Sequence, residues 1–267
     1  MTAPYPQIVL FGDSLIQGSV GVDHGFSFQA SLQTRCIRRL DVVNRGFSGW
    51  NTKNALEYFD RIFPAPTSSS PKMAFLVILL GANDAVLPLE YTSQHVPREQ
   101  YKKNLETIIN HPHIQAHKPK ILLVTPPPLD EIKATKLDLE KGLPQGTRTS
   151  AISASYSETA REVARENPSI ILIDLWKGLM DRAIEMAPND YKPGGPWLGS
   201  PGNGKQGGLD TLLPDGLHMN GEAYQILYDL IKPHIGPHWT GNPELDRGEY
   251  VLPDWRDINV PIGSRIP

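Results

Sequence analysis

Short apolar runs recur along the chain, and segments with helical periodicity separate them. Residues 73–80 are apolar without alternation, which is typical of a central strand that helices cover on both faces. Four other runs share this apolar, β-branched character, at residues 8–11, 42–43, 121–124 and 170–173. The pattern therefore predicts five strands.

The segments between these runs predict helices. Apolar positions at helical spacing indicate helices at about residues 26–39, 53–63, 98–110, 150–166, 177–186 and 221–235. Because helix follows strand throughout, we expect an α/β fold, a three-layer α/β/α sandwich around a five-stranded parallel sheet. In the flavodoxin-like strand order 2-1-3-4-5, ligands bind beyond the carboxyl ends of the strands, where strand 1 lies between strands 2 and 3.

Length and composition favour a single domain over residues 1–267. The 267 residues, 39% of them hydrophobic, are enough for one sizeable core, which we expect within residues 8–235. Residues 236–267 are Pro-rich and irregular, and their aromatic residues predict a tail that wraps the body or forms a subunit contact. The sequence leaves the oligomeric state open.

Charge and cysteine content exclude several classes of protein. A net charge of −3 gives no general attraction to nucleic acid or to anionic membranes, so neither partner is expected. No apolar run approaches the roughly 20 residues that span a bilayer, and the first residues lack the regions of a signal peptide. We therefore expect a cytoplasmic protein. The single Cys36 excludes an intramolecular disulfide and a multi-cysteine zinc site, and we expect a buried, inert thiol.

Candidate chemistry begins at Ser14, in a Gly-Asp-Ser-Leu stretch where the first predicted strand turns into a loop. An ordinary turn accounts for these residues as well. A serine becomes a useful nucleophile only where a base takes its proton and donors receive the oxyanion. Blocks that contain Gly49 and Asn83 follow the second and third predicted strands, so the expected strand order brings both residues to the edge where Ser14 lies.

Asp215 and His218 offer the base. They stand three residues apart before a predicted helix, so the carboxylate can reach one imidazole nitrogen while the other faces Ser14. Taken alone, His218 is more often a surface histidine. Asp13 and Asp84 are interpreted as residues that shape turns, because acids beside the nucleophile would oppose formation of the oxyanion.

The order of four blocks, around Ser14, at residues 44–52 (NRGFSGWNT), at 81–85 (GANDA) and at 215–218 (DGLH), resembles the SGNH (GDSL) hydrolase superfamily. Residues 44–52, 81–88, 94–97 (QHVP) and 125–128 (TPPP) are similar to the isoamyl acetate-hydrolysing esterases of that superfamily. The resemblance covers about residues 8–235. It implies a cofactor-independent enzyme whose oxyanion hole contains the Ser14 amide, a glycine amide and the Asn83 side chain. The family pattern Asn-x-x-x-Ser-Gly selects Gly49 as that glycine, with Gly46 as the structural alternative.

Residues 188–213 form a glycine-rich loop that is longer than is usual in that subfamily. We interpret it as a mobile rim of the pocket, in which Trp197 and Leu198 bind substrate by capping a short acyl site. Its glycine spacing also fits phosphate-binding motifs, but the motif neither follows a strand nor opens a helix, so no nucleotide is expected. His111, His113 and His117 have no carboxylate partner in sequence and are interpreted as a solvated turn, so no metal site is predicted.

The sequence therefore predicts a serine esterase that hydrolyses small carboxylic esters through an acyl-enzyme, without metal or cofactor. A deacetylase of acylated carbohydrates, a thioesterase or a lysophospholipase would use the same site. A binding protein that keeps the fold without turnover is a further alternative, and the presence of all the required side chains argues against it.

Overall fold

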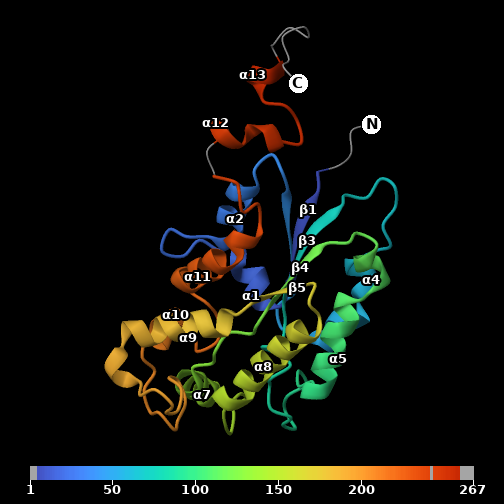
Figure 1. Ribbon diagram of the computed structural model, residues 1–267. Coiled ribbons are helices and arrows are strands. Elements are labelled where there is room, and N and C mark those ends of the chain that lie inside the picture. Colours follow the sequence, from blue (N-terminus) through green and yellow to red (C-terminus); the bar gives the residue numbers. More distant parts are fainter. Residues whose placement is uncertain (1–4, 241–242, 259–267) are drawn as a thin grey trace.

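The computed structural model describes residues 5–240 and 243–258, and its centre is a five-stranded parallel sheet (Figure 1). The strands run in the order β2-β1-β3-β4-β5, which confirms the predicted topology. They are β1 (Gln7–Gly12), β2 (Asp41–Gly46), β3 (Met73–Leu79), β4 (Lys120–Val124) and β5 (Ile170–Ile173).

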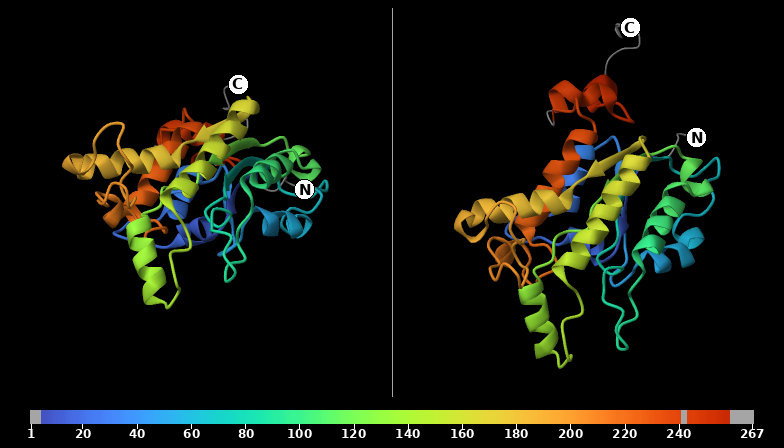
Figure 2. Two further views of the ribbon diagram at one scale, coloured as in Figure 1. Left: turned by 90° about the horizontal axis from the view of Figure 1, so that it is seen from below. Right: turned by 60° about the horizontal axis from the view of Figure 1, so that its bottom comes forward.

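Helices cover both faces of this sheet and complete the expected three layers (Figures 1 and 2). One face carries α2 (Phe28–Cys36), α9 (Leu175–Met186), α10 (Leu209–Leu212) and α11 (Gly221–Ile231). The other carries α3 (Thr52–Glu57), α4 (Phe59–Ile62), α5 (Arg98–Ile109), α6 (Pro112–Gln115) and α8 (Ser150–Glu166).

The two faces have separate hydrophobic cores. Along β1, Ile8 and Leu10 point into the core beneath α2 and α11, whereas Val9 and Phe11 point into the core beneath α4 and α5. Successive residues of a strand alternate between its two faces, so a strand that is covered on both sides needs apolar residues at every position. This explains the continuous apolar runs in the sequence.

Two predicted helices end differently in the structure. The segment at 53–63 is two short helices, α3 and α4, which are separated at Tyr58. The segment at 221–235 remains α-helical only to Ile231, and a 3₁₀ turn follows at Lys232–His234. Pro233 has no N–H to continue the α-helical hydrogen bonds, which accounts for the change.

Several short helices and one longer helix were not predicted, and two of these helices lie at the carboxyl edge of the sheet. The short helix α1 (Ser14–Gln17) begins directly after β1, where we expected a loop. Helix α7 (Glu131–Glu140) begins at its N-cap Asp130 and lies below the sheet in the view of Figure 1. None of the α7 residues is fully buried, so its sequence lacks the apolar periodicity that identifies a packed helix.

The loop at 188–213 is fastened to the body. Leu198 and Leu209 are fully buried, and the Gly199 carbonyl accepts a hydrogen bond from the Ile132 amide of α7 at 3.2 Å. Its glycine-rich segment leads into α10, which corrects the expectation that it opens no helix, although it does not follow a strand. The loop therefore contacts the first turn of α7 and helps to hold it in place.

The described residues of the predicted tail, 236–240 and 243–258, pack at one end of the body. The tail helices α12 (Pro243–Asp246) and α13 (Trp255–Ile258) gather beyond the end of α2, at the amino edge of the sheet (Figure 1). The Arg39 guanidinium lies over the rings of Trp239 at 4.7 Å and Tyr250 at 4.9 Å, so these two aromatic residues anchor the tail. Residues 259–267 of the predicted tail lie outside the described residues.

Cys36 ends α2 with no exposed surface, as expected of a buried thiol. Burial raises the pKa of this thiol to about 12, against the opposing charges of Arg35 and Arg39. In the described part of the chain, every helix is too short or too polar to cross a lipid bilayer.

Candidate active site

Ser14 stands at the carboxyl end of β1, as the first residue of α1. The side chain of Asp13 caps this helix, because its Oδ1 accepts a hydrogen bond from the Leu15 amide at 2.9 Å. Gly12 allows the tight passage from strand to helix, since a Cβ there would lie 2.3 Å from the Leu79 carbonyl oxygen. The turn therefore fixes Ser14 at the edge of the sheet, with its side chain half-buried.

His218 and Asp215 lie beside Ser14, as their spacing suggested. Ser14 Oγ is 2.9 Å from His218 Nε2, and His218 Nδ1 is 2.6 Å from Asp215 Oδ2. The other carboxylate oxygen accepts hydrogen bonds from the backbone amides of Leu217 and His218. The carboxylate is thus held in place by the chain that carries the imidazole, and it orients the ring toward Ser14.

These contacts shift two pKa values in opposite directions. The hydrogen bond that the His218 ring donates to Asp215 raises the pKa of His218 above its usual value, and burial opposes this effect. Burial alone would raise the pKa of Asp215, but its hydrogen bonds with His218 outweigh burial and lower it. Asp215 is therefore ionised at neutral pH, and it stabilises an imidazolium on His218.

The turn after β2 brings Gly49 to the same cavity, whereas Gly46 has a structural role. Gly46 ends β2, and a Cβ there would lie 2.0 Å from the Gln17 backbone nitrogen. Gly49 has a positive φ of 81° and lines the cavity, and its carbonyl accepts a hydrogen bond from Gln94 at 2.7 Å. Neither the Gly49 amide nor the Ser14 amide donates a hydrogen bond to a described residue.

Asn83 follows β3 and is almost completely buried at the wall of the cavity. Its Nδ2 donates to the Trp50 carbonyl at 2.9 Å. The neighbouring Asp84 accepts hydrogen bonds from the amide and hydroxyl of Thr52, and so ties this turn to the start of α3. Asp84 therefore shapes a turn, as expected, and burial raises its pKa to about 6, against the Thr52 hydrogen bonds.

Asp13 is the more unusual of the two acids. Its Oδ2 is buried and has no hydrogen-bond partner among the described residues. Burial raises the pKa of Asp13 to about 7, although its hydrogen bond with Leu15 lowers it. The Asp13 carboxyl is therefore partly protonated near neutral pH. It opposes negative charge at Ser14 less than a fully ionised carboxylate would.

A cavity of about 200 Å³ connects these residues. Its polar wall contains Ser14, Ser48, Gly49, Asn83, Arg148, Asp215 and His218, and the remaining wall contains Leu129, Ala134, Leu137, Asp138, Lys141 and Leu217. Four residues of this second group come from α7 and its C-cap: Ala134, Leu137, Asp138 and Lys141. Sequence reasoning missed this wall and Arg148, although Asp130 after a proline run is an available signal for the start of a helix.

Trp197 and Leu198 do not line the Ser14 cavity, so the expectation that they cap it is corrected. Leu198 is fully buried in the core beneath α9. Trp197 stacks on Tyr191 and lies in a separate apolar pocket with Trp176. Leu129 lines both pockets, which are therefore neighbours. The loop was misinterpreted because buried core residues and the wall of a pocket have the same apolar composition.

The expectation that the histidines at α6 have no carboxylate partner is also corrected, because Asp60 lies beside two of them. Asp60 Oδ1 lies 3.8 Å from His111 Nε2 and 3.3 Å from His113 Nδ1. His111 Nδ1 accepts the His113 amide, and His113 Nδ1 donates to the Phe63 carbonyl. Both nitrogens that face Asp60 therefore carry protons, whereas a metal ligand needs a free lone pair.

Comparisons with known proteins identify the family of the chain. Residues 10–226 match the GDSL-like lipase/acylhydrolase family. An isoamyl acetate-hydrolyzing esterase 1 homolog of Rattus norvegicus is 30% identical over 260 residues, which cover 95% of this chain and 88% of the relative. A GDSL esterase/lipase of Arabidopsis thaliana is 37% identical over 244 residues, which cover 90% of this chain and 89% of that protein.

Solved structures share the fold. A lipase/acylhydrolase from Enterococcus faecalis has a TM-score of 0.57 and 22% identity, over 89% of this chain and 98% of the other. An acetyl xylan esterase has a TM-score of 0.60 and 18% identity, over 86% of this chain and 99% of the other. At these identities the likeness concerns the fold alone.

Proposed function

The chain belongs to the GDSL-like lipase/acylhydrolase family and is a carboxylic ester hydrolase, and we propose that it cleaves short-chain acyl esters through an acyl-enzyme on Ser14. One observation carries the proposal: a continuous hydrogen-bonded path runs from Ser14 Oγ through the His218 ring to Asp215. The path opens into the cavity that Gly49 and Asn83 also line.

In the proposed reaction, His218 Nε2 takes the proton of Ser14 as its Oγ attacks the ester carbonyl. The resulting oxyanion accepts hydrogen bonds from the amides of Ser14 and Gly49 and from Asn83 Nδ2. When the tetrahedral intermediate collapses, the C–O bond breaks and His218 returns its proton to the leaving alcohol. Water then attacks the acyl-enzyme by the same path and releases the acid and free Ser14.

The size of the cavity supports a short acyl group. Its volume of about 200 Å³ includes the space for the reacting ester, and Ala134 and Leu137 of α7 bound it on the apolar side. Each additional methylene contributes only about 0.8 kcal/mol of burial, so a closed wall, and not weak attraction, excludes longer chains. We expect acetate to butyrate esters to be preferred.

A fluorophosphonate, which reacts with activated serines, tests this assignment. We expect one equivalent to label the wild-type protein on Ser14, and Ser14→Ala to lose both the label and p-nitrophenyl acetate hydrolysis while keeping its melting temperature. Ser200→Ala, in the loop outside the cavity, is the matched control and should retain both. An adduct on Ser48 or Ser200, or turnover by Ser14→Ala, would overturn the proposal.

An acylated carbohydrate is the second candidate substrate, because an aromatic surface continues from the Gly49 turn. Phe47 and Trp50 stack with ring centroids 4.4 Å apart, and Tyr58 lies 5.3 Å from Trp50. These rings line a groove that is able to hold a sugar face. If it holds the alcohol part, Trp50→Ala should raise KM for acetylated xylooligosaccharides and leave KM for p-nitrophenyl acetate unchanged. An equal change for both substrates would reject this candidate.

A further inference from the structure

Arg148 lies at the polar wall of the cavity, just before α8, and its hydrogen bonds to the described residues all go to uncharged oxygens. Its Nε donates to the Ala82 carbonyl at 3.3 Å, its Nη1 lies 3.5 Å from Thr147 Oγ1, and its Nη2 donates to Asn83 Oδ1 at 3.1 Å. No carboxylate of a described residue forms an ion pair with it. Burial lowers its pKa, although the charges of Asp138 and Asp13 oppose this effect.

The contact with Asn83 determines which way that amide faces. An amide has a donor end and an acceptor end, and each needs a suitable partner when it is buried. Asn83 Oδ1 faces the Arg148 donor, and Nδ2 faces the Trp50 carbonyl at 2.9 Å. The flipped amide would put NH₂ against a guanidinium and oxygen against a carbonyl. One Nδ2 hydrogen is used by Trp50, and the second remains for the cavity.

We propose that Arg148 is a positioning residue of the oxyanion site, which holds the Asn83 amide with its free N–H directed into the cavity. The proposal rests on the proposed esterase function and assigns the residue a role in the same reaction. A donor that is already oriented costs no reorganisation when negative charge develops on the substrate.

Helix α7 supports this arrangement. Thr147 is buried, and its amide and hydroxyl donate to Asp138 Oδ2 at 2.8 and 2.7 Å. At the other end of the helix, Glu131 Oε2 accepts hydrogen bonds from the amide and hydroxyl of Ser150 at 2.8 Å. The segment that carries Arg148 is thus fastened to both ends of α7. The helix that walls the cavity also holds the residue that orients the oxyanion donor.

Steady-state hydrolysis of p-nitrophenyl acetate by Arg148→Met and Arg148→Lys tests the proposal. Loss of one Oδ1 restraint should lower kcat roughly 10- to 100-fold in Arg148→Met, which is less than the roughly 10²- to 10³-fold loss on removal of the donor itself in Asn83→Ala. KM should change little. Arg148→Lys should recover part of kcat, because its ammonium still donates to Asn83 Oδ1. A rise in KM with unchanged kcat would overturn the proposal in favour of direct substrate binding.

A double-variant cycle gives the decisive comparison. If Arg148 acts through Asn83, Arg148→Met in the Asn83→Ala background should cost no further kcat. Losses that multiply would show that Arg148 acts on the reaction independently, and would overturn the inference. Arg148→Lys provides the same cycle if Arg148→Met does not fold, as judged by its melting temperature.

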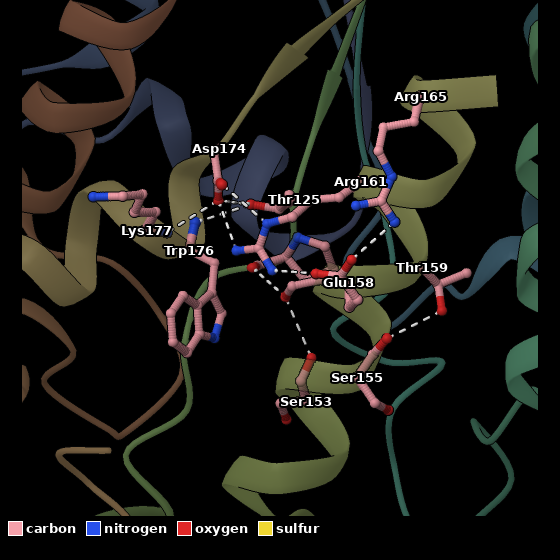
Figure 3. Close-up of polar contacts among 12 residues, drawn as sticks. Thr125, Ser153, Ser155, Glu158, Thr159, Arg161, Arg165, Asp174, Trp176 and Lys177 are labelled. Carbon is pink, nitrogen blue, oxygen red and sulfur yellow. Dashed lines mark hydrogen bonds and ion pairs between the residues drawn. The ribbon is translucent and has the colours of Figure 1, made fainter. Parts of the chain in front are cut away.

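Two controls separate this inference from the proposed function. Arg161→Met removes a half-buried arginine of α8 that pairs with Asp174 outside the cavity (Figure 3), and should leave kcat unchanged. A short alkyl boronic acid, which forms a tetrahedral anion on serine, should lose affinity in the Arg148 variants in proportion to kcat/KM. Activity that survives Ser14→Ala refutes the function, whereas multiplicative losses with an inactive Ser14→Ala refute only the role of Arg148.

Discussion

The cavity and the cluster around Arg161 use an arginine in opposite ways. Nε and Nη2 of Arg161 donate to Asp174, each at 2.9 Å, and Nη1 donates to Glu158 at 3.1 Å (Figure 3). Arg148 instead donates to a carbonyl, a hydroxyl and an amide oxygen. The guanidinium of Arg161 is thus paired with two carboxylates, whereas that of Arg148 lies at the wall of the cavity without a carboxylate partner among the described residues.

The pKa values follow this difference. Burial alone would lower the pKa of Arg161, but the hydrogen bond and charge of Asp174 outweigh burial and raise it. For Arg148, burial outweighs the more distant carboxylates, and the pKa falls. A paired arginine contributes to folding stability, whereas an arginine that donates to the oxygen of a buried amide can hold that amide in one orientation. Substitutions in the two regions should therefore separate activity from stability.

The largest effect is expected from Asp215→Asn in the cavity. The Oδ1 of the new asparagine can still accept the backbone amides of Leu217 and His218. Its NH₂ group then replaces the oxygen that accepts the His218 ring proton, so kcat should fall on the order of 10⁴-fold. Because Asp215 is half exposed, the melting temperature should stay near that of the wild type. A stability loss that matches the activity loss would remove the distinction between the two regions.

The pH profile gives the next largest effect. His218 must be neutral to accept the Ser14 proton, and its pKa is raised, so kcat/KM should increase with pH through an apparent pKa above roughly 6.5. Below that pKa, activity should fall about tenfold per pH unit. Wild type and Arg161→Gln should give the same profile in assays from pH 5 to 9. A flat profile between pH 5 and 8 would count against His218 as the base.

In the other region, Arg161→Gln should affect stability alone. Removal of the charge-assisted hydrogen bonds to Asp174 should lower the unfolding free energy by about 1–3 kcal/mol in urea denaturation, with kcat unchanged. Arg165→Gln is the control, because Arg165 is mostly exposed and its one ion pair with a described residue is to Glu158. This substitution should cost less than about 1 kcal/mol.

The same pair predicts how that stability loss varies with pH. Burial raises the pKa of Asp174, but its hydrogen bonds with Arg161 outweigh burial and lower it. The contribution of the pair is therefore present above the unfolded pKa of about 3.9 and is lost as pH falls through the lower folded value. The difference between wild type and Arg161→Gln should shrink toward pH 3, and a difference that grows there would contradict the pairing.

The smallest effect concerns the acyl group. Leu137→Ala should open the α7 wall and improve kcat/KM for butyrate and hexanoate relative to acetate by about fourfold per methylene accommodated. Trp197→Ala is the matched control and should leave the ratio unchanged, because Trp197 lies outside the cavity. If Trp197→Ala alone changed the preference for longer acyl groups, the loop at 188–213, and not α7, would be the wall of the acyl site.

The strand order and the meeting of Ser14, Gly49 and Asn83 were predictable because parallel strands end at a common edge. Arg148 was not, since it is a single arginine in a loop that has no periodicity to mark it. Helix α7 was not predicted for a related reason. It has no fully buried residue, so its sequence lacks the apolar periodicity of a packed helix. Patterning in sequence reports burial, and so it identifies the sheet better than the walls of a cavity.

Long-range partners set the other limit. Asp60 meets His111 and His113 only because α4 and α6 pack together, and nothing in their local sequence encodes that contact. Leu198 shows the reverse case: an apolar residue in a long loop predicts an exposed rim and a buried anchor equally well, and only the fold decides between them.

The burial of Cys36 makes the protein a ready subject for site-directed labelling. It is the one cysteine of the sequence, it has no exposed surface, and its pKa of about 12 leaves almost no thiolate at neutral pH. A maleimide dye added to the native protein should therefore find no background target. A cysteine introduced at Lys136, on the exposed side of α7, would carry a single fluorophore and report directly on whether this helix moves when an ester enters.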